Sequence, residues 1–427
     1  MILNSEEKER ILLVGVDLGD RNIDIRSSMN ELAELVKAAD GYVVSEVIQN
    51  KDYIDTTFFV GKGKAEEIRN YSHELDIDTV VFNDELSGAQ LKNLEKVIER
   101  KIIDRTNLIL DIFAKRATSK EGKLQVELAQ LKYRLPRLVG LRDYLSREGG
   151  GIGTRGPGEK KAETDRRHIL REINNIEKQL KDVEQVREVK RKKRMDSKLP
   201  IVALVGYTNA GKSTLLNKII EMNKDYDTSK NVFVYDMLFA TLDTTFRRAY
   251  LPNGQEFLIT DTVGFVNKLP THLIEAFKGT LEEVKYADLI LHIVDSSSKD
   301  LDIQIKTTYK ILNDLKILNK PIINVFNKID KIDKEKVIYR DSLTGEKIYI
   351  SAKEGLNLNL LLEMIQNNLP EMYFCVKLLI PYKEQYLLSY FYENYNMEEV
   401  IHDEEGTYVK LSLSSIDYEK YKKFIIE

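Results

Sequence analysis

Short apolar runs alternate with helical spacings in the first quarter of the chain. The runs cover residues 11–18, 42–48, 57–60 and 79–83. Their length and their β-branched residues are typical of buried strands. Between them, residues 27–39 and 87–100 place apolar side chains three and four positions apart, as amphipathic helices do. This alternation predicts a small α/β domain that ends near residue 113.

Two longer apolar stripes follow, with a glycine-rich stretch between them. The first stripe is Leu124, Leu128, Leu131, Leu135 and Leu138, and the second is Ile169, Ile173, Ile176, Leu180, Val183 and Val186. Residues 149–158 combine several glycines with a proline, a composition that disfavours regular structure. We therefore predict that the two helices fold back on each other as a hairpin with this stretch at its tip.

Strand and helix patterns alternate again from "PIVALVG", which starts at Pro200, until "NNLPEMYF" interrupts them near residue 370. The chain is thus expected to be a multidomain α/β protein. The predicted parts are an α/β domain (1–113), a helical hairpin (114–198), a domain with a mainly parallel sheet (199–370) and a small α+β domain (371–427).

Charge is distributed unevenly, although the formal net charge is only -4. Residues 155–198 hold fifteen Lys or Arg against nine Asp or Glu, whereas residues 371–427 hold six against eleven. The hairpin is therefore the expected contact for a polyanion, and the last domain is not. A single cysteine, Cys375, and the lack of an apolar segment long enough for a signal peptide or membrane span favour the cytoplasm. Peripheral membrane association stays open.

The stretch "GYTNAGKST", residues 206–214, has the P-loop spacing between an apolar strand and a helical pattern. Backbone amides of Asn209 through Thr214 would surround the phosphates, and the helix amino terminus would add partial positive charge. Lys212 would neutralise the β- and γ-phosphates, and the Ser213 hydroxyl would bind Mg²⁺. A Ras-like P-loop domain is the prediction for residues 199–370.

Three further segments follow strands in the order expected of a GTP site. "FLITDTVG" contains Asp261, which can reach the Mg²⁺ shell through water, and Gly264, whose amide can sense the γ-phosphate. "INVFNKID" carries Asp330, a carboxylate that can accept from N1 and the 2-amino group of guanine but would face a lone pair in adenine, which favours GTP over ATP. "IYISAKEG" can cover the base. The GTP-binding residues predicted from these motifs are Gly206, Tyr207, Thr208, Asn209, Ala210, Gly211, Lys212, Ser213, Thr214, Asp261, Thr262, Val263, Gly264, Asn327, Lys328, Ile329, Asp330, Ser351, Ala352 and Lys353.

The sequence resembles the HflX family of translational GTPases along nearly its whole length. The resemblance rests on "DRTNLILDIFAKRATSKEGKLQVELAQLKYRLPRL", "GGGIGTRGPGE" and "DMLFATLDTTFRR" as well as the nucleotide motifs. It implies that "FATLD" is the first switch. It further implies nucleotide contact by Phe239, Ala240, Thr241, Leu242 and Asp243, with Thr241 also on Mg²⁺. Lys212, Ser213, Thr241 and Gly264 are then the expected catalytic residues.

The same resemblance implies binding to the large ribosomal subunit and splitting or rescue of stalled or idle ribosomes. Separately, the protein is expected to be a monomer. The glycine-rich tip suits contact with ribosomal RNA, because it is narrow and has a basic rim. The RNA-binding candidates are Arg147, Gly149, Gly150, Gly151, Arg155, Lys160 and Lys161. The alternative interpretation of the tip is a flexible hinge.

Phe265 occupies the position at which many nucleotide hydrolases carry a water-orienting glutamine. A phenyl ring cannot align a water molecule, so hydrolysis is expected to be slow alone and stimulated by ribosomes. Hydrophobic packing of the segment would explain the same residue.

Two other functions remain open. One is a non-ribosomal regulatory GTPase that binds protein or membrane partners through its hairpin. The other is ATP-dependent RNA or ribosome remodelling from the amino-terminal domain. It would need a second nucleotide site at "FFVGKGKAEEI", residues 58–68, which lacks the P-loop spacing.

Overall fold

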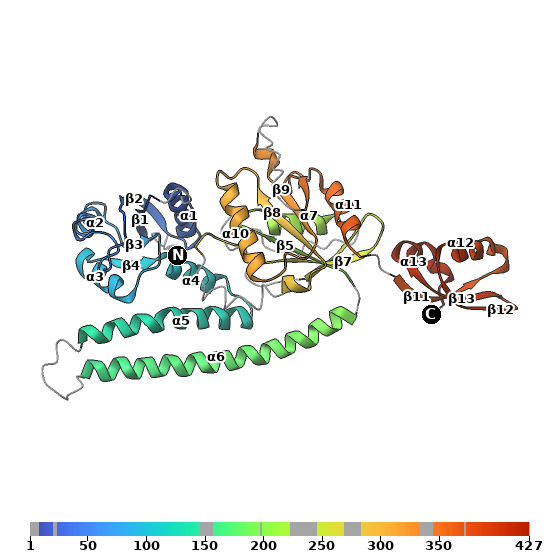
Figure 1. The fold of residues 1–427 in the computed structure, drawn as a ribbon, viewed down its shortest axis with the longest axis horizontal. Helices are drawn as coiled ribbons and strands as arrows, with labels where there is room; N and C mark the ends of the chain where they lie inside the picture. Colours follow the sequence, from blue (N-terminus) through green and yellow to red (C-terminus); the bar gives the residue numbers. More distant parts are fainter. Residues whose placement is uncertain are drawn as a thin grey trace, which may run out of the picture.

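The computed structural model describes residues 8–19, 24–145, 157–196, 199–222, 246–268, 283–332, 345–370 and 373–426 (Figure 1). Within these residues the chain forms three separate sheets and one long helical hairpin. Figure 1 shows the first and second sheets next to each other and the third at the far end of the molecule. The multidomain α/β prediction is confirmed.

The amino-terminal sheet is parallel, with strand order β2-β1-β3-β4. Its strands are β1 (Arg10–Asp17), β2 (Tyr42–Asn50), β3 (Thr79–Phe82) and β4 (Lys101–Asp104). Its helices are α1 (Ile25–Ala38), α2 (Lys62–Glu74), α3 (Gly88–Ile98) and α4 (Arg105–Arg116). The strand β4 escaped the sequence analysis, because its two isoleucines lie between charged residues and do not form an apolar run.

The prediction of a strand at 57–60 was wrong. Phe59 makes only an isolated bridge with Asp55 and has a φ of 67°, which no strand residue adopts. One carboxylate oxygen of Asp55 accepts hydrogen bonds from the amides of Thr57 and Phe58, both at 2.8 Å, and thereby stabilises a turn. The apolar residues are still buried, at 5 % exposure for Phe59 and 0 % for Val60, so burial alone produced a strand-like pattern.

The hairpin consists of α5 (Lys120–Leu145) and α6 (Pro157–Asp196). The predicted stripes face each other along the hairpin, and Leu128 and Ile173 are among the buried residues of their shared cluster. Val186, however, is 57 % exposed, because α6 has 40 residues and α5 only 26. The predicted irregular tip also overlaps the start of α6, since proline is well suited to the first helical position.

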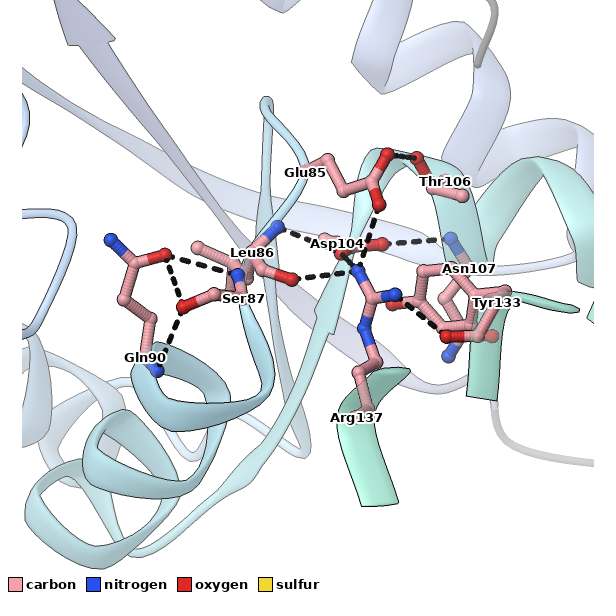
Figure 2. Close-up of polar contacts among 9 residues, drawn as sticks. All are labelled: Glu85, Leu86, Ser87, Gln90, Asp104, Thr106, Asn107, Tyr133 and Arg137. Carbon is pink, nitrogen blue, oxygen red and sulfur yellow. Dashed lines mark hydrogen bonds and ion pairs between the residues drawn. The ribbon is translucent and has the colours of Figure 1, made fainter. Parts of the chain in front are cut away.

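Arg137 of α5 fixes the hairpin to the amino-terminal sheet (Figure 2). Its guanidinium donates to the fully buried Asp104 at 3.1 Å and to the carbonyl of Leu86 at 2.6 Å. It also lies 3.4 Å from the centroid of the Tyr133 ring. On the sheet side, Asp104 accepts from the amides of Leu86 and Asn107 at 2.9 and 2.8 Å. Polar contacts of the Arg137 side chain therefore attach the hairpin to the amino-terminal sheet.

The central sheet has strand order β10-β9-β8-β5-β7-β6 and is parallel except for the edge strand β6. Its strands are β5 (Ile201–Gly206), β6 (Phe246–Tyr250), β7 (Glu256–Asp261), β8 (Leu289–Asp295), β9 (Ile322–Asn327) and β10 (Glu346–Tyr349). Helices α7 (Lys212–Glu221), α10 (Leu301–Asp314) and α11 (Leu358–Asn368) pack against it. This is the mainly parallel sheet that the sequence predicts.

The carboxy-terminal sheet is antiparallel, with order β11-β13-β12. Its elements are β11 (Tyr373–Ile380), α12 (Tyr386–Asn394), β12 (Met397–Asp403), β13 (Gly406–Ser414) and α13 (Ser415–Tyr421). They enclose a core of their own around Leu378, Phe391 and Leu411. No helix in the described part of the chain is long and apolar enough to cross a membrane.

Candidate functional site

The loop from Gly206 to Gly211 joins β5 to α7 at the carboxyl edge of the central sheet. Gly206 has a φ of 151°, and a Cβ there would lie 2.2 Å from the carbonyl oxygen of Ile293. Gly211 has a φ of 95°, and a Cβ there would lie 2.2 Å from Nδ2 of Asn327. Both positions therefore require glycine. The loop can pass close to neighbouring strands only because these two side chains are absent.

Lys212 begins α7 and points back into the loop. Its ammonium donates to the carbonyl oxygens of Gly206 at 3.1 Å and Tyr207 at 2.9 Å. Burial lowers the pKa of Lys212 to about 8, against the opposing effect of the nearby Asp261 carboxylate. A Cβ on Gly264 would lie 3.1 Å from this ammonium, so the segment after β7 passes directly beside it. The structure thus brings two of the predicted motifs together.

Ser213 and Asp261 form the pair expected at a magnesium site. The Ser213 hydroxyl donates to Oδ2 of Asp261 at 2.5 Å, and Oδ1 accepts from the amide of Thr262 at 2.8 Å. A hydroxyl and a carboxylate are hard oxygen ligands of the kind that Mg²⁺ prefers. Among the described residues there is no cluster of three or more His, Cys, Asp or Glu that could hold a metal. Beside phosphates, Mg²⁺ is usually held by few protein ligands and keeps several water molecules.

Thr208 carries a second indication of a polar ligand. Its side-chain oxygen is buried and has no hydrogen-bond partner among the residues that the structure describes. Buried hydroxyl groups are normally paired, since an unpaired one costs about 1–3 kcal/mol. The hydroxyl belongs to the loop that also positions Lys212.

Asn327 connects three of the predicted segments. Its Nδ2 donates to the carbonyl of Ala210 at 2.8 Å, and its Oδ1 accepts from the amide of Ala352 at 2.9 Å. Beside it, the Ser351 hydroxyl donates to Asp330 at 2.5 Å, and Lys328 pairs with Asp295 at 2.8 Å. The loops after β5, β9 and β10 are therefore held together by side-chain contacts. Sequence motifs gave no indication of this linking role for Asn327.

Two predicted residues differ from the others in their surroundings. Lys353 directs its side chain, 77 % exposed, toward Glu354, so only its backbone is near the linked loops. Phe265 is 2 % exposed and packs in the hydrophobic cluster that includes Val205 and Ile290. Its backbone bonds to the P-loop: the amide of Thr208 donates to the Phe265 carbonyl at 2.8 Å, and the Phe265 amide donates to the carbonyl of Gly206 at 3.1 Å. Hydrophobic packing accounts for the phenyl ring.

Several predicted residues lie outside the described part of the chain. They are Phe239, Ala240, Thr241, Leu242 and Asp243 of the expected first switch, and Arg147, Gly149, Gly150, Gly151 and Arg155 of the hairpin tip. Lys160 and Lys161 lie in the first turns of α6, where only the backbone is described.

Family models match the chain in three consecutive stretches. Residues 26–114 match "GTP-binding GTPase N-terminal", residues 116–194 match "GTP-binding GTPase Middle Region", and residues 201–328 match "50S ribosome-binding GTPase". A relative from Caldanaerobacter subterraneus subsp. tengcongensis, called GTPase HflX, is 48% identical over 99% of this chain and 95% of its own length. The chain belongs to the HflX family of GTPases.

Two further similarities complete the comparison. A GTPase HflX from Lacrimispora saccharolytica is 51% identical over 89% of this chain and 87% of its own length. Among solved structures, a GTP-binding protein from Sulfolobus solfataricus in complex with GDP is 25% identical, with a TM-score of 0.43, over 84% of this chain and 98% of that one. Membership of the HflX family makes the protein a nucleotide-binding GTPase.

Proposed function

We propose that the P-loop and the segments it contacts bind GTP with Mg²⁺. Lys212 supplies positive charge to the β- and γ-phosphates, and the amide of Gly264 faces the γ-phosphate. Ser213 coordinates the metal directly, and Asp261, whose carboxylate the Ser213 hydroxyl contacts, holds its water shell. Bound Mg²⁺ would neutralise charge that develops on the phosphates. The Ser213–Asp261 pair and the unpartnered hydroxyl of Thr208 support this assignment.

Guanine is selected by Asp330. Its carboxylate accepts from N1 and the 2-amino group of guanine, while Ser351 already holds one of its oxygens in place. Adenine lacks both donors, so the carboxylate would be left unpaired beside it. Asn327 keeps the base-binding loops attached to the P-loop through its two hydrogen bonds.

We further propose that the GTP-bound protein attaches to the large ribosomal subunit and splits or rescues stalled or idle ribosomes. Relatives carry the name GTPase HflX, and the matching domain model is described as a 50S ribosome-binding GTPase. Residues 155–198 carry a surplus of Lys and Arg over Asp and Glu that can pair with RNA phosphates, which predicts salt-sensitive binding. The free protein hydrolyses GTP slowly, because the phenyl ring of Phe265 is packed in a hydrophobic cluster and cannot orient a water molecule. Hydrolysis accelerates on the ribosome.

Sedimentation tests this proposal. Wild-type protein with a non-hydrolysable GTP analogue is mixed with purified large subunits and spun through a sucrose cushion. Co-migration with the analogue and its loss with GDP or at high salt are the expected results. Absence of co-migration at every salt concentration would favour a regulatory GTPase with a different partner.

The structure gives little support to a second nucleotide site at residues 58–68. Gly61 begins α2 with an ordinary φ of -67°, and its amide donates to Oε1 of Gln49 at 3.1 Å. Lys64 pairs with Glu67 on the same helix at 2.7 Å. These groups serve the turn that leads into α2, so ATP-dependent remodelling from this domain is the weaker proposal.

A further inference from the structure

Glu31 belongs to α1 of the amino-terminal domain, yet it contacts both loops of the proposed nucleotide site. The Tyr207 hydroxyl, on the P-loop, donates to Oε1 of Glu31 at 2.6 Å. The amide of Asn267, in the segment after β7, donates to the same oxygen at 3.2 Å. Figure 1 shows α1 on the side of its domain that faces the central sheet.

The second carboxylate oxygen of Glu31 is held from its own domain. Arg105 donates to Oε2 at 2.6 Å and to Oδ1 of Asn83 at 2.9 Å, and the arginine side chain is only 2 % exposed. Arg105 and Asn83 follow β4 and β3, at the carboxyl edge where parallel sheets commonly bind ligands. In this domain, the carboxyl edge of the sheet binds the carboxylate of Glu31, which in turn contacts the P-loop of the central domain.

The surroundings of Glu31 strengthen the link between the domains. Val263 and Val266, from the segment after β7, belong to the hydrophobic cluster of the amino-terminal domain that includes Leu32. Lys268 forms an ion pair with Asp84 across the same boundary. Tyr207 stays a hydrogen-bond donor, since burial and the adjacent carboxylate raise the pKa of its hydroxyl.

Gly264 precedes Asn267 by three residues and lies beside Thr208 and Lys212 of the P-loop. The P-loop and the segment after β7 are joined by two backbone hydrogen bonds at Phe265, and Glu31 connects Tyr207 and Asn267 on either side of that joint. The Gly264 amide is the group that would distinguish GTP from GDP. We propose that Glu31 is a positioning residue of the nucleotide site, through which the amino-terminal domain sets the preference for GTP over GDP.

The reasoning rests on the proposed nucleotide site. A segment that is already ordered loses less conformational entropy when the γ-phosphate binds. Removing Glu31 frees the segment to move, so GTP loses affinity and GDP, which does not reach Gly264, loses little.

The test compares equilibrium binding of a non-hydrolysable GTP analogue and of GDP to the full-length protein and its variants. Glu31→Ala is expected to weaken the GTP analogue about tenfold, a typical coupling between two sites, and GDP about twofold at most. Glu31→Gln keeps an amide oxygen for Tyr207 and Asn267 but cannot accept from Arg105. It should therefore lose stability toward urea while keeping a nearly wild-type ratio of GTP to GDP affinity. Glu34→Gln, on the exposed side of the same helix, is the matched control.

Three results would overturn the proposal. The first is a wild-type affinity ratio in Glu31→Ala, and the second is a ratio in Glu31→Gln that falls together with its stability. A Tyr207→Phe change should add little to the ratio in the Glu31→Ala background, so additive effects also count against it. Lys212→Ala is measured in parallel. If it retains nucleotide affinity, the proposed nucleotide site is wrong, whatever the Glu31 variants do.

Discussion

Replacing Arg137 by methionine should destabilise the protein by about 3 kcal/mol. Removing one partner of a buried ion pair typically costs about 3–5 kcal/mol, because the other charge stays buried without compensation. Asp104 is 0 % exposed but keeps the amides of Leu86 and Asn107, which places the expected cost at the lower end of the range. The contact between Arg137 and Glu85 adds little, since the Glu85 side chain is 46 % exposed.

The cost should also depend on pH. Burial raises the pKa of Asp104, and Arg137 is one of the groups that oppose the rise. Without Arg137 the pKa of this carboxyl increases further, so the folded variant takes up a proton at a higher pH than the unfolded chain. Below that pKa the buried group is neutral and its missing partner matters less. The difference in unfolding free energy between wild type and variant should therefore be smaller at pH 5 than at pH 8.

Urea unfolding followed by circular dichroism measures both effects, and the absence of tryptophan rules out the usual fluorescence probe. Arg134→Met, an exposed position on the same helix, is the control and should change the unfolding free energy by less than about 0.5 kcal/mol. An Arg137→Met variant as stable as this control, or one whose cost is equal at both pH values, would refute the reasoning.

Three further predictions concern the nucleotide site. Phe265→Gln should cost about 3–5 kcal/mol of stability, because the side chain at this position lies in the core. For the same reason it should not raise GTP turnover per folded molecule, and faster turnover in a kinetic assay would contradict this. GTP affinity should fall above pH 8 and be about tenfold weaker at pH 9 than at neutral pH. The reason is that bound phosphates require a protonated Lys212, whereas the pKa of Lys212 in the nucleotide-free protein is about 8. Calorimetry in buffers of different ionisation enthalpy should show proton uptake on binding near pH 9, and its absence would exclude Lys212 as the titrating group. Asp330→Asn should weaken GTP about a hundredfold or more without strengthening ATP, and calorimetry that finds unchanged GTP affinity would remove Asp330 from the base site.

Local patterns predicted most of the fold. The strands and helices of the central sheet, and the two stripes of the hairpin, have regular periods that sequence makes visible. The prediction of a strand at 57–60 was wrong because Phe59 and Val60 are buried although they lie in a turn. A buried apolar residue looks the same in the sequence whether its backbone forms a strand or a turn. Strand β4 was missed for the opposite reason, since only Ile102 and Ile103 of its four residues are apolar and charged residues flank them.

The candidate site could be located from sequence wherever one motif contains its residues. Gly206, Gly211 and Lys212 lie within seven residues of the chain, so the spacing alone predicts that they share one loop. Contacts between distant segments carry no such signal: Glu31 and Tyr207 are 176 residues apart. Glu31 resembles any partly buried glutamate on an amphipathic helix until the fold places it beside the P-loop.

The measurement that tests the account most directly is the rate of GTP hydrolysis by the full-length protein during a titration with purified large ribosomal subunits. Hydrolysis should be slow without subunits and should increase many-fold, to saturation, as they are added, while Lys212→Ala stays inactive throughout. A rate that stays unchanged up to saturating subunit concentration would contradict it.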